Sequence, residues 1–129
     1  MCGNHGGSSL ITRIRTQAIY VTDQAKAERF WVDCLGFDVR EKDDMGNGYY
    51  WLEVMPKGAE TALSLFPRAL MKDWEVKKPS IVFECEDVDD AYREMTNKGV
   101  KFIQKPTTEC WGTYAIFQDE DGNQFILKS

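Results

Sequence analysis

The sequence predicts an α+β fold made of two tandem βαβββ modules that form a curved mixed sheet with a concave pocket. One reason is that two amphipathic helical segments, each preceded by an aspartate and followed by a glycine, recur at nearly the same spacing. Another is that each helical segment follows one strand-like run and precedes three more. The expected segments are a flexible leader at 1–11, a first module at 12–66, a connector at 67–78 and a second module at 79–129.

The first module begins with a loosely alternating run at residues 12–21, which predicts a strand with Ile19 and Val21 on one face. Asp23 can cap the helix that follows, because its carboxylate accepts hydrogen bonds from free N–H groups of the first turn. Gly36 ends this helix, since glycine adopts the left-handed conformation without a Cβ clash. The remaining expected features are a helical stripe of Ala27, Phe30, Trp31, Cys34 and Leu35 and strands at 37–40, 49–54 and 61–66.

The second module repeats this order of elements. Residues 80–85 form the predicted strand, with Ile81 and Phe83 on one face, Asp87 is the second candidate cap and Gly99 ends the second helix. The further expected features are a helical stripe of Val88, Ala91, Tyr92 and Met95, strands at 100–104, 112–118 and 123–128, and a short helix at 69–74 inside the connector.

A pocket is expected where the two modules meet. Each helix covers one face of its sheet, so the other face stays open, and two such units side by side can form one larger curved sheet. Pockets between related halves are favoured sites for small ligands. Strand alternation, module equivalence and nearby aromatic residues indicate the side chains that line it, although each aromatic ring can instead belong to the core. The predicted pocket residues are Thr16, Tyr20, Tyr49, Trp51, Ser64, Ser80, Glu84, Trp111, Tyr114 and Ile126.

Composition argues against several classes of partner. The net charge of -5 disfavours nucleic acid, whose binders present a basic face to phosphates. No apolar run approaches the roughly 20 residues that cross a bilayer, and residues 1–9 do not read as a secretory signal. We therefore expect a cytoplasmic protein with neither nucleic acid nor a membrane as its partner.

The four cysteines are widely spaced, without a C-x-x-C pair, and are expected to be free thiols. A nucleophilic cysteine needs a nearby base, but the only histidine is His5 in the leader. Cys2 and His5 together supply too few ligands for a good metal site.

Two motifs resemble those of the vicinal-oxygen-chelate superfamily, which includes glyoxalase I, extradiol dioxygenases and the fosfomycin- and bleomycin-resistance proteins. The first module reads I-Y-V-T-D-x-x-x-A-x-x-F-W-x-D-x-L-G-F, and the second closes with W-G-T-Y-A-I-F-Q-D-E-D-G-N-Q-F. Glu120 stands where the second family signature usually has proline. The resemblance covers roughly residues 12–128 and is specific to the fold, much less so to any activity.

The resemblance implies four metal ligands in metal-using members, His or Gln on the first and fifth strands and Glu on the fourth and eighth. The matching positions here are Thr16, Ser80, Ser64 and Ile126. Hydroxyl groups and an aliphatic side chain are poor ligands for a divalent cation. We therefore expect neither a metal at these positions nor another cofactor. Displaced carboxylates, namely those of Glu53, Glu60 and Glu84, remain an alternative set of ligands for Mg²⁺ or Mn²⁺.

Three functions are compatible with these features. The first is a metal-free binding protein, resembling bleomycin-resistance proteins, that holds an aromatic or cationic organic ligand against aromatic walls. The second is a lyase, isomerase or dioxygenase that uses a displaced divalent metal. The third is a structural or regulatory domain whose pocket is filled by its own side chains. The resemblance also implies a homodimer.

Overall fold

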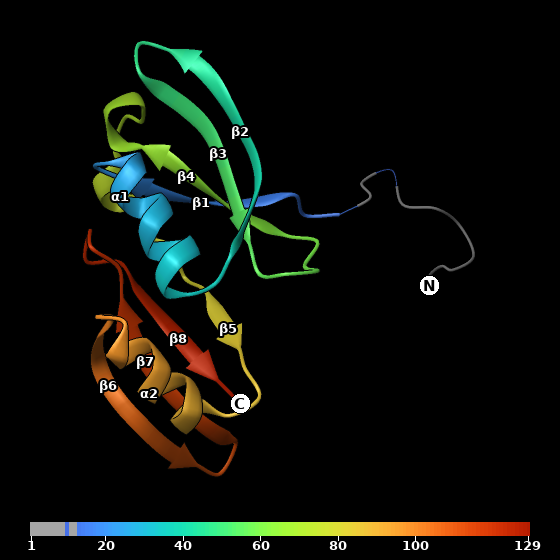
Figure 1. Cartoon of the computed structure of the whole chain (residues 1–129), viewed down its shortest axis with the longest axis vertical. Coiled ribbons are helices and arrows are strands. Elements are labelled where there is room, and N and C mark those ends of the chain that lie inside the picture. The colour runs from blue at the N-terminus through green and yellow to red at the C-terminus, as the bar shows by residue number, and fades with distance from the viewer. Residues whose placement is uncertain (1–9, 11–12) are drawn as a thin grey trace.

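The computed structural model describes residue 10 and residues 13–129, and it contains two modules that lie one above the other in Figure 1. Most of the predicted leader, including Cys2 and His5, lies outside the described residues. The first module contains β1 (Thr16–Val21), α1 (Gln24–Arg29), η1 (Phe30–Cys34), β2 (Asp38–Gly46), β3 (Tyr49–Met55) and β4 (Ala62–Pro67). The connector contains the short 3-10 turns η2 (Arg68–Leu70) and η3 (Trp74–Val76). The second module contains β5 (Val82–Glu84), α2 (Val88–Asn97), β6 (Lys101–Glu109), β7 (Gly112–Gln118) and β8 (Gln124–Lys128).

The strands form two four-stranded mixed sheets with the same topology, β1-β4-β3-β2 and β5-β8-β7-β6. In each sheet the first strand of the module pairs in parallel with the last, and the other neighbours are antiparallel. This confirms the α+β fold of two βαβββ modules, since the repeat extends to the strand order. The larger sheet expected from joining both modules is not formed within the described part of one chain, where the two sheets stay separate.

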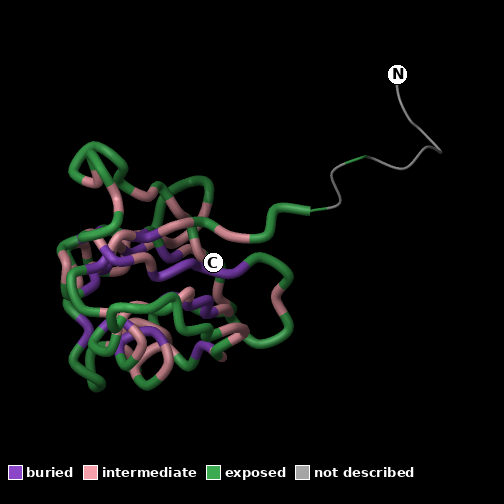
Figure 2. The backbone as a smooth tube through the Cα atoms, turned by 90° about the horizontal axis from the view of Figure 1, so that it is seen from above, coloured by how far each residue is buried: buried purple, intermediate pink, exposed green. Residues whose placement is uncertain are grey.

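One hydrophobic core serves both sheets, and Trp31 lies at its centre. This fully buried side chain in η1 packs on Phe37 of its own module, with ring centroids 5.2 Å apart. It also packs on Phe83, Phe117 and Phe125 of the second module at 5.8, 6.4 and 5.1 Å. Figure 2 shows the buried segments gathered in the interior of the molecule. Because the helix-bearing faces of both sheets meet in this core, the opposite face of each sheet points away from it.

Both predicted helix caps are present. The Asp23 carboxylate accepts a hydrogen bond from the Lys26 amide, and the Asp87 carboxylate accepts one from the Asp90 amide, each at 3.1 Å. The first helix differs from the regular one predicted, because its last turn widens into the π-helical segment η1. Apolar spacing alone does not reveal such a change in winding, which leaves the same residues facing the core.

Several strand boundaries differ from the predicted ones. Strands β2 and β6 continue well beyond the predicted ends at residues 40 and 104, because their outer halves pair in long hairpins although they carry polar residues. Strand β5 is shorter than the predicted strand at 80–85. In place of one short helix at 69–74, the connector forms two single 3-10 turns that overlap the ends of that range, and Asp73 takes a left-handed conformation (φ 60°) between them. In the described residues, none of the helices has both the length and the apolar character needed to span a membrane.

Candidate functional site

The open face of the first sheet gathers residues from three neighbouring strands. Register places Thr16 beside Ala62, Ala18 beside Ser64, and Tyr20 beside Phe66, while Ser64 also pairs with Glu53 of β3. Since side chains at alternate positions of a strand share a face, Trp51 lies on the same side as Glu53. We call this surface face A and define it by Thr16, Tyr20, Trp51, Glu53, Ser64 and Phe66.

Three half-buried aromatic rings form a continuous row on face A. Phe66 lies between Tyr20 and Trp51, and its ring centroid is 6.2 Å from each of theirs. Both contacts are edge-to-face, with interplanar angles of 89° and 71°. This arrangement presents aromatic surface of the kind that stacks on a flat ligand.

A fully buried carboxylate, that of Glu53, lies beside this row of rings. Its Oε1 accepts hydrogen bonds from Arg40 Nε at 2.7 Å and Arg15 Nη2 at 3.3 Å. Its Oε2 accepts from Trp51 Nε1 at 2.8 Å and Arg15 Nε at 3.2 Å. Burial alone would raise the pKa of Glu53, but the hydrogen bonds from Arg40 and Trp51 and the charges of both arginines lower it below the ordinary value. Glu53 is therefore ionised at neutral pH and fully engaged.

The donor set on this face does not fit a divalent cation. Thr16 and Ser64 offer only hydroxyl groups, and both oxygens of the nearest carboxylate, Glu53, are held by cationic or indole N–H groups. The side chain of Glu60 does not add a ligand in this network, which uses only its backbone oxygen as an acceptor for Arg40. In the part of the chain that the structure describes, no three His, Cys, Asp or Glu side chains are grouped so that they could hold a metal ion.

An acidic pair borders face A on strand β2. Register places Glu41 opposite Glu53 and Asp43 opposite Trp51. A hydrogen bond with Asp43 raises the pKa of Glu41 above its ordinary value, and burial and the negative charges of Asp43 and Glu53 act in the same direction, whereas Arg15 opposes them. Arg15 pairs with Glu41 at 2.8 Å, but the carboxylates of this network and its border (Glu41, Asp43, Glu53) outnumber the guanidinium groups of Arg15 and Arg40. The edge beside the Trp51 ring therefore keeps a net negative charge, which favours a cationic group.

The open face of the second sheet carries the other half of the predicted pocket. Ile126 lies between Val82 and Ile116, and Lys128 lies between Glu84 and Tyr114. Trp111, in the turn between β6 and β7, packs on Tyr114 with ring centroids 5.1 Å apart. This face is notably apolar for exposed surface, since Val82 is 59% and Trp111 53% exposed. We call it face B, defined by Val82, Glu84, Trp111, Tyr114, Ile116, Ile126 and Lys128.

The predicted pocket residues are therefore divided between two surfaces. Face A contains Thr16, Tyr20, Trp51 and Ser64, and face B contains Glu84, Trp111, Tyr114 and Ile126. Ser80 is exposed and precedes β5, and Tyr49 begins β3 and lines a separate hollow beside α1. One chain does not bring the two groups together, because the two sheets meet through their helix-bearing faces.

Sequence reasoning missed Phe66 of face A, the two arginines that hold Glu53, and the acidic pair at the border of the face. Phe66 could have been found, since it continues the alternation of Ala62 and Ser64 along β4. Arg15 and Arg40 carried no comparable signal, because Arg15 precedes β1 and Arg40 lies at a register shift between β2 and β3.

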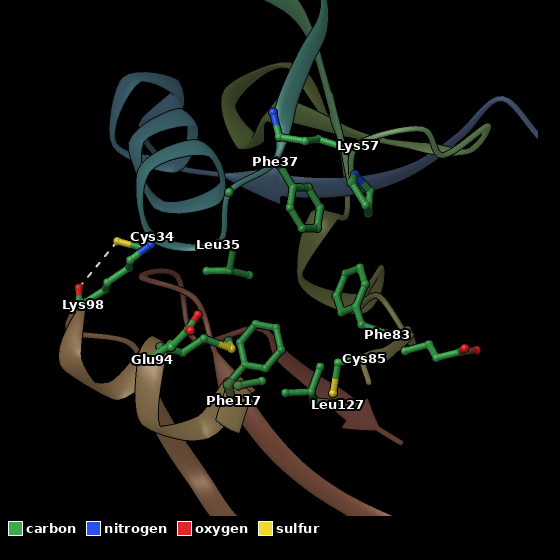
Figure 3. Close-up of a pocket in the computed structure, with 15 residues that line it drawn as sticks. Cys34, Leu35, Phe37, Lys57, Phe83, Cys85, Glu94, Lys98, Phe117 and Leu127 are labelled. Atoms are coloured by element: carbon green, nitrogen blue, oxygen red, sulfur yellow. Dashed lines mark hydrogen bonds between the residues drawn. The ribbon is translucent and has the colours of Figure 1, made fainter. Parts of the chain in front are cut away.

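A separate pocket of about 420 Å³ lies between the modules on the helix side (Figure 3). The rings of Phe37 and Phe83 point into it from different modules, and the thiols of Cys34 and Cys85 lie at its wall. Burial raises the pKa of the Cys85 thiol, which is therefore protonated at neutral pH and a weak nucleophile. Both cysteines are free thiols, as predicted, and so is Cys110.

Comparison with known proteins identifies relatives over nearly the whole chain. Residues 13–127 match the family described as the Glyoxalase/Bleomycin resistance protein/Dioxygenase superfamily. The uncharacterized protein YetH of Bacillus subtilis (strain 168) is 50% identical over 119 residues, which cover 92% of this chain and 99% of YetH. A superfamily member from Sphaerobacter thermophilus DSM 20745 superimposes with a TM-score of 0.83 at 32% identity, covering 93% of this chain and 98% of its own. TnmS3, an antibiotic binding protein from Streptomyces sp. CB03234, gives a TM-score of 0.75 at 32% identity, covering 94% and 98%.

Proposed function

Because this chain belongs to the glyoxalase/bleomycin resistance/dioxygenase superfamily, we propose that it is a metal-free protein that binds a small organic molecule on face A. The ligand is aromatic, cationic or both. The rings of Tyr20, Phe66 and Trp51 supply stacking surface, and the acidic pair of Glu41 and Asp43 supplies negative charge at its edge. The description of the similar protein TnmS3 as antibiotic binding supports a small organic ligand.

The observation that carries the proposal is that both carboxylate oxygens of Glu53 already accept hydrogen bonds from protein side chains. Chemistry of the metal-using kind requires a carboxylate or imidazole that can replace the water around a divalent cation. At the positions that match the family's ligands, this chain has Thr16, Ser64, Ser80 and Ile126. The one buried carboxylate nearby already accepts hydrogen bonds from two arginines and a tryptophan. Releasing it to a metal would leave the Arg40 guanidinium without its counter-charge and Arg15 with only Glu41 as its partner.

A second copy of the chain completes the pocket in this proposal. Strands β1 and β5 are edge strands, and each borders an open face with apolar side chains. If β5 of one subunit lies beside β1 of its partner, face B of the first subunit continues face A of the second around one curved surface, so that Trp111, Tyr114 and Ile126 face the row of rings across the concave side. A two-fold dimer would contain two such pockets, since each subunit contributes one face A and one face B.

Binding can be tested with purified protein and a panel of flat aromatic compounds that includes the cation proflavine. We expect calorimetry to detect binding by the wild type, and we expect Trp51→Ala to weaken it at least tenfold. Tyr50→Ala is the matched control, because Tyr50 is an aromatic neighbour on the same strand that contacts Lys42 rather than face A. A wild type that binds no member of the panel contradicts the proposal.

Metal content separates this proposal from an enzyme that uses a displaced metal. Elemental analysis of dialysed protein is expected to find no stoichiometric Zn, Ni, Mn or Fe. A bound metal that disappears in Glu84→Ala would instead favour the lyase, isomerase or dioxygenase alternative.

The dimer can be tested separately by sedimentation velocity. We expect Val82→Asp to convert the dimer to monomer, because it places a charge on the apolar edge of face B. Val76→Asp, at an 81% exposed position in the connector, is the matched control and should stay dimeric. A monomeric wild type at micromolar concentration would refute this part of the proposal.

A further inference from the structure

We propose that Glu53 is a positioning residue that holds the Trp51 indole as a preformed platform for the flat part of the ligand. This inference rests on the proposed function, because it concerns how face A recognises its ligand. In this role the buried carboxylate of Glu53 neither binds a metal nor transfers a proton.

The contact between the two side chains is direct. Glu53 and Trp51 are two residues apart on β3, so their side chains project on the same side of the sheet. Trp51 Nε1 donates a 2.8 Å hydrogen bond to Glu53 Oε2. The indole also makes an edge-to-face contact with the ring of Phe66. A half-buried indole on an open sheet face can otherwise rotate about its side-chain bonds. The hydrogen bond at one end and the Phe66 ring at the other fix its plane.

The carboxylate can serve as an anchor because it is itself held on every side. Arg40 Nε donates to Oε1, while the two other contacts of that guanidinium go to the backbone oxygens of Glu60 and Arg15. Arg15 reaches both carboxylate oxygens and also pairs with Glu41 at 2.8 Å. An uncharged acceptor could receive the indole hydrogen bond, but only a carboxylate also binds both arginines. The two arginines thus hold the Glu53 side chain in place, and its acceptor oxygen Oε2 holds the ring.

This geometry determines what Trp51 offers to a ligand. Its only polar group, the indole N–H, is already used inside the protein, so the ring is available only through its face. The platform therefore favours a flat π system over a bulky saturated group of equal charge. Because the ring is ordered before binding, the ligand does not bear the entropy cost of fixing it.

The test compares proflavine, a flat cation, with tetrabutylammonium, a bulky saturated cation, on the wild type and three variants. We expect Glu53→Met to weaken proflavine binding about fivefold and to leave the weak binding of tetrabutylammonium unchanged. Glu53→Gln should restore most of the proflavine affinity, because the amide oxygen can accept the indole hydrogen bond. Phe125→Leu, which alters the buried core of the second sheet, controls for lost stability and should bind proflavine like the wild type.

A second measurement follows the ring in the ligand-free protein. The indole N–H resonance of Trp51, assigned with Trp51→Phe, should be protected from solvent exchange in the wild type and in Glu53→Gln, and should lose protection in Glu53→Met. Equal protection in all three, or equal proflavine affinity of Glu53→Met and wild type, overturns the positioning role. A wild type that binds none of the flat compounds overturns the proposed function instead.

Discussion

Replacing Glu53 by glutamine should reveal how much the buried carboxylate contributes to stability. Its side chain is fully buried, whereas Arg40 is 17% and Arg15 51% exposed. Breaking a buried ion pair from one side costs about 3–5 kcal/mol, but an exposed partner contributes about 1 kcal/mol or less. Glutamine keeps an acceptor for the indole of Trp51. We therefore expect the free energy of unfolding at pH 7 to fall by about 2–3 kcal/mol.

The loss should depend on pH in a defined direction. Arg40, Trp51 and Arg15 lower the pKa of Glu53 in the folded protein despite its burial. As the pH falls, Glu53 is therefore protonated in the unfolded chain, near the ordinary pKa of 4.5, before it is protonated in the folded protein. The ionised form then stabilises the fold fully above about pH 4.5, and this contribution disappears as the pH falls through the lowered pKa. The difference between wild type and Glu53→Gln should therefore shrink on acidification.

Urea denaturation followed by circular dichroism between pH 3 and 7 measures this difference. Glu41 faces Glu53 across the sheet and its raised pKa depends partly on the Glu53 charge, so the comparison is repeated in a Glu41→Gln background. A difference between the proteins that stays constant over this range, or a loss at pH 7 below about 0.5 kcal/mol, would refute the reasoning, because the carboxylate would then gain nothing from its partners.

Two further predictions concern backbone positions. Asp87→Ala should destabilise the protein by about 1 kcal/mol in urea denaturation, because it removes the cap of α2. Asp89→Ala, in the first turn but without a capping hydrogen bond, should destabilise it less. Gly112→Ala should destabilise the protein more than Gly122→Ala, although both glycines have positive φ. A Cβ at Gly112 would lie 2.8 Å from the backbone oxygen of Ser129, whereas a Cβ at Gly122 would meet nothing within 4 Å. Equal losses at the two glycines would contradict the steric argument.

The elements and their order could be predicted because they depend on local signals. The caps at Asp23 and Asp87 act within one turn, and the buried face of β1 with Ile19 and Val21 follows from simple alternation. The outer halves of β2 and β6 escaped prediction because their pairing depends on the partner strand rather than on apolar periodicity. The π-helical turn escaped it for a similar reason, since spacing does not record a change in winding.

The site was only partly predictable because alternation assigns a residue to a face, but does not say which faces oppose each other. Packing decides which faces oppose each other. Here Trp31 contacts both modules, so the helix-bearing faces of the two sheets share one core. Faces A and B are left outward as a consequence. Arginines present a further difficulty, because Arg15 and Arg40 belong to the site through their reach to Glu53 rather than through any pattern of their own.

The two motifs that carry the family resemblance are linked to each other by hydrogen bonds between the modules. Asp119, in the turn between β7 and β8, accepts hydrogen bonds from the backbone amides of Asp121 and Asn123 and from the Asn123 side chain. The turn so formed directs the carboxylate of Asp121 toward the first module, where it accepts from the Thr22 hydroxyl at 2.7 Å. Arg68 of the connector donates to the backbone oxygens of both Tyr20 and Asp121, each at 3.4 Å. These contacts join the first motif to the second without touching the row of rings on face A. These contacts therefore help to fix the relative placement of the two modules, while Trp51 and Phe66 of face A lie outside both motifs.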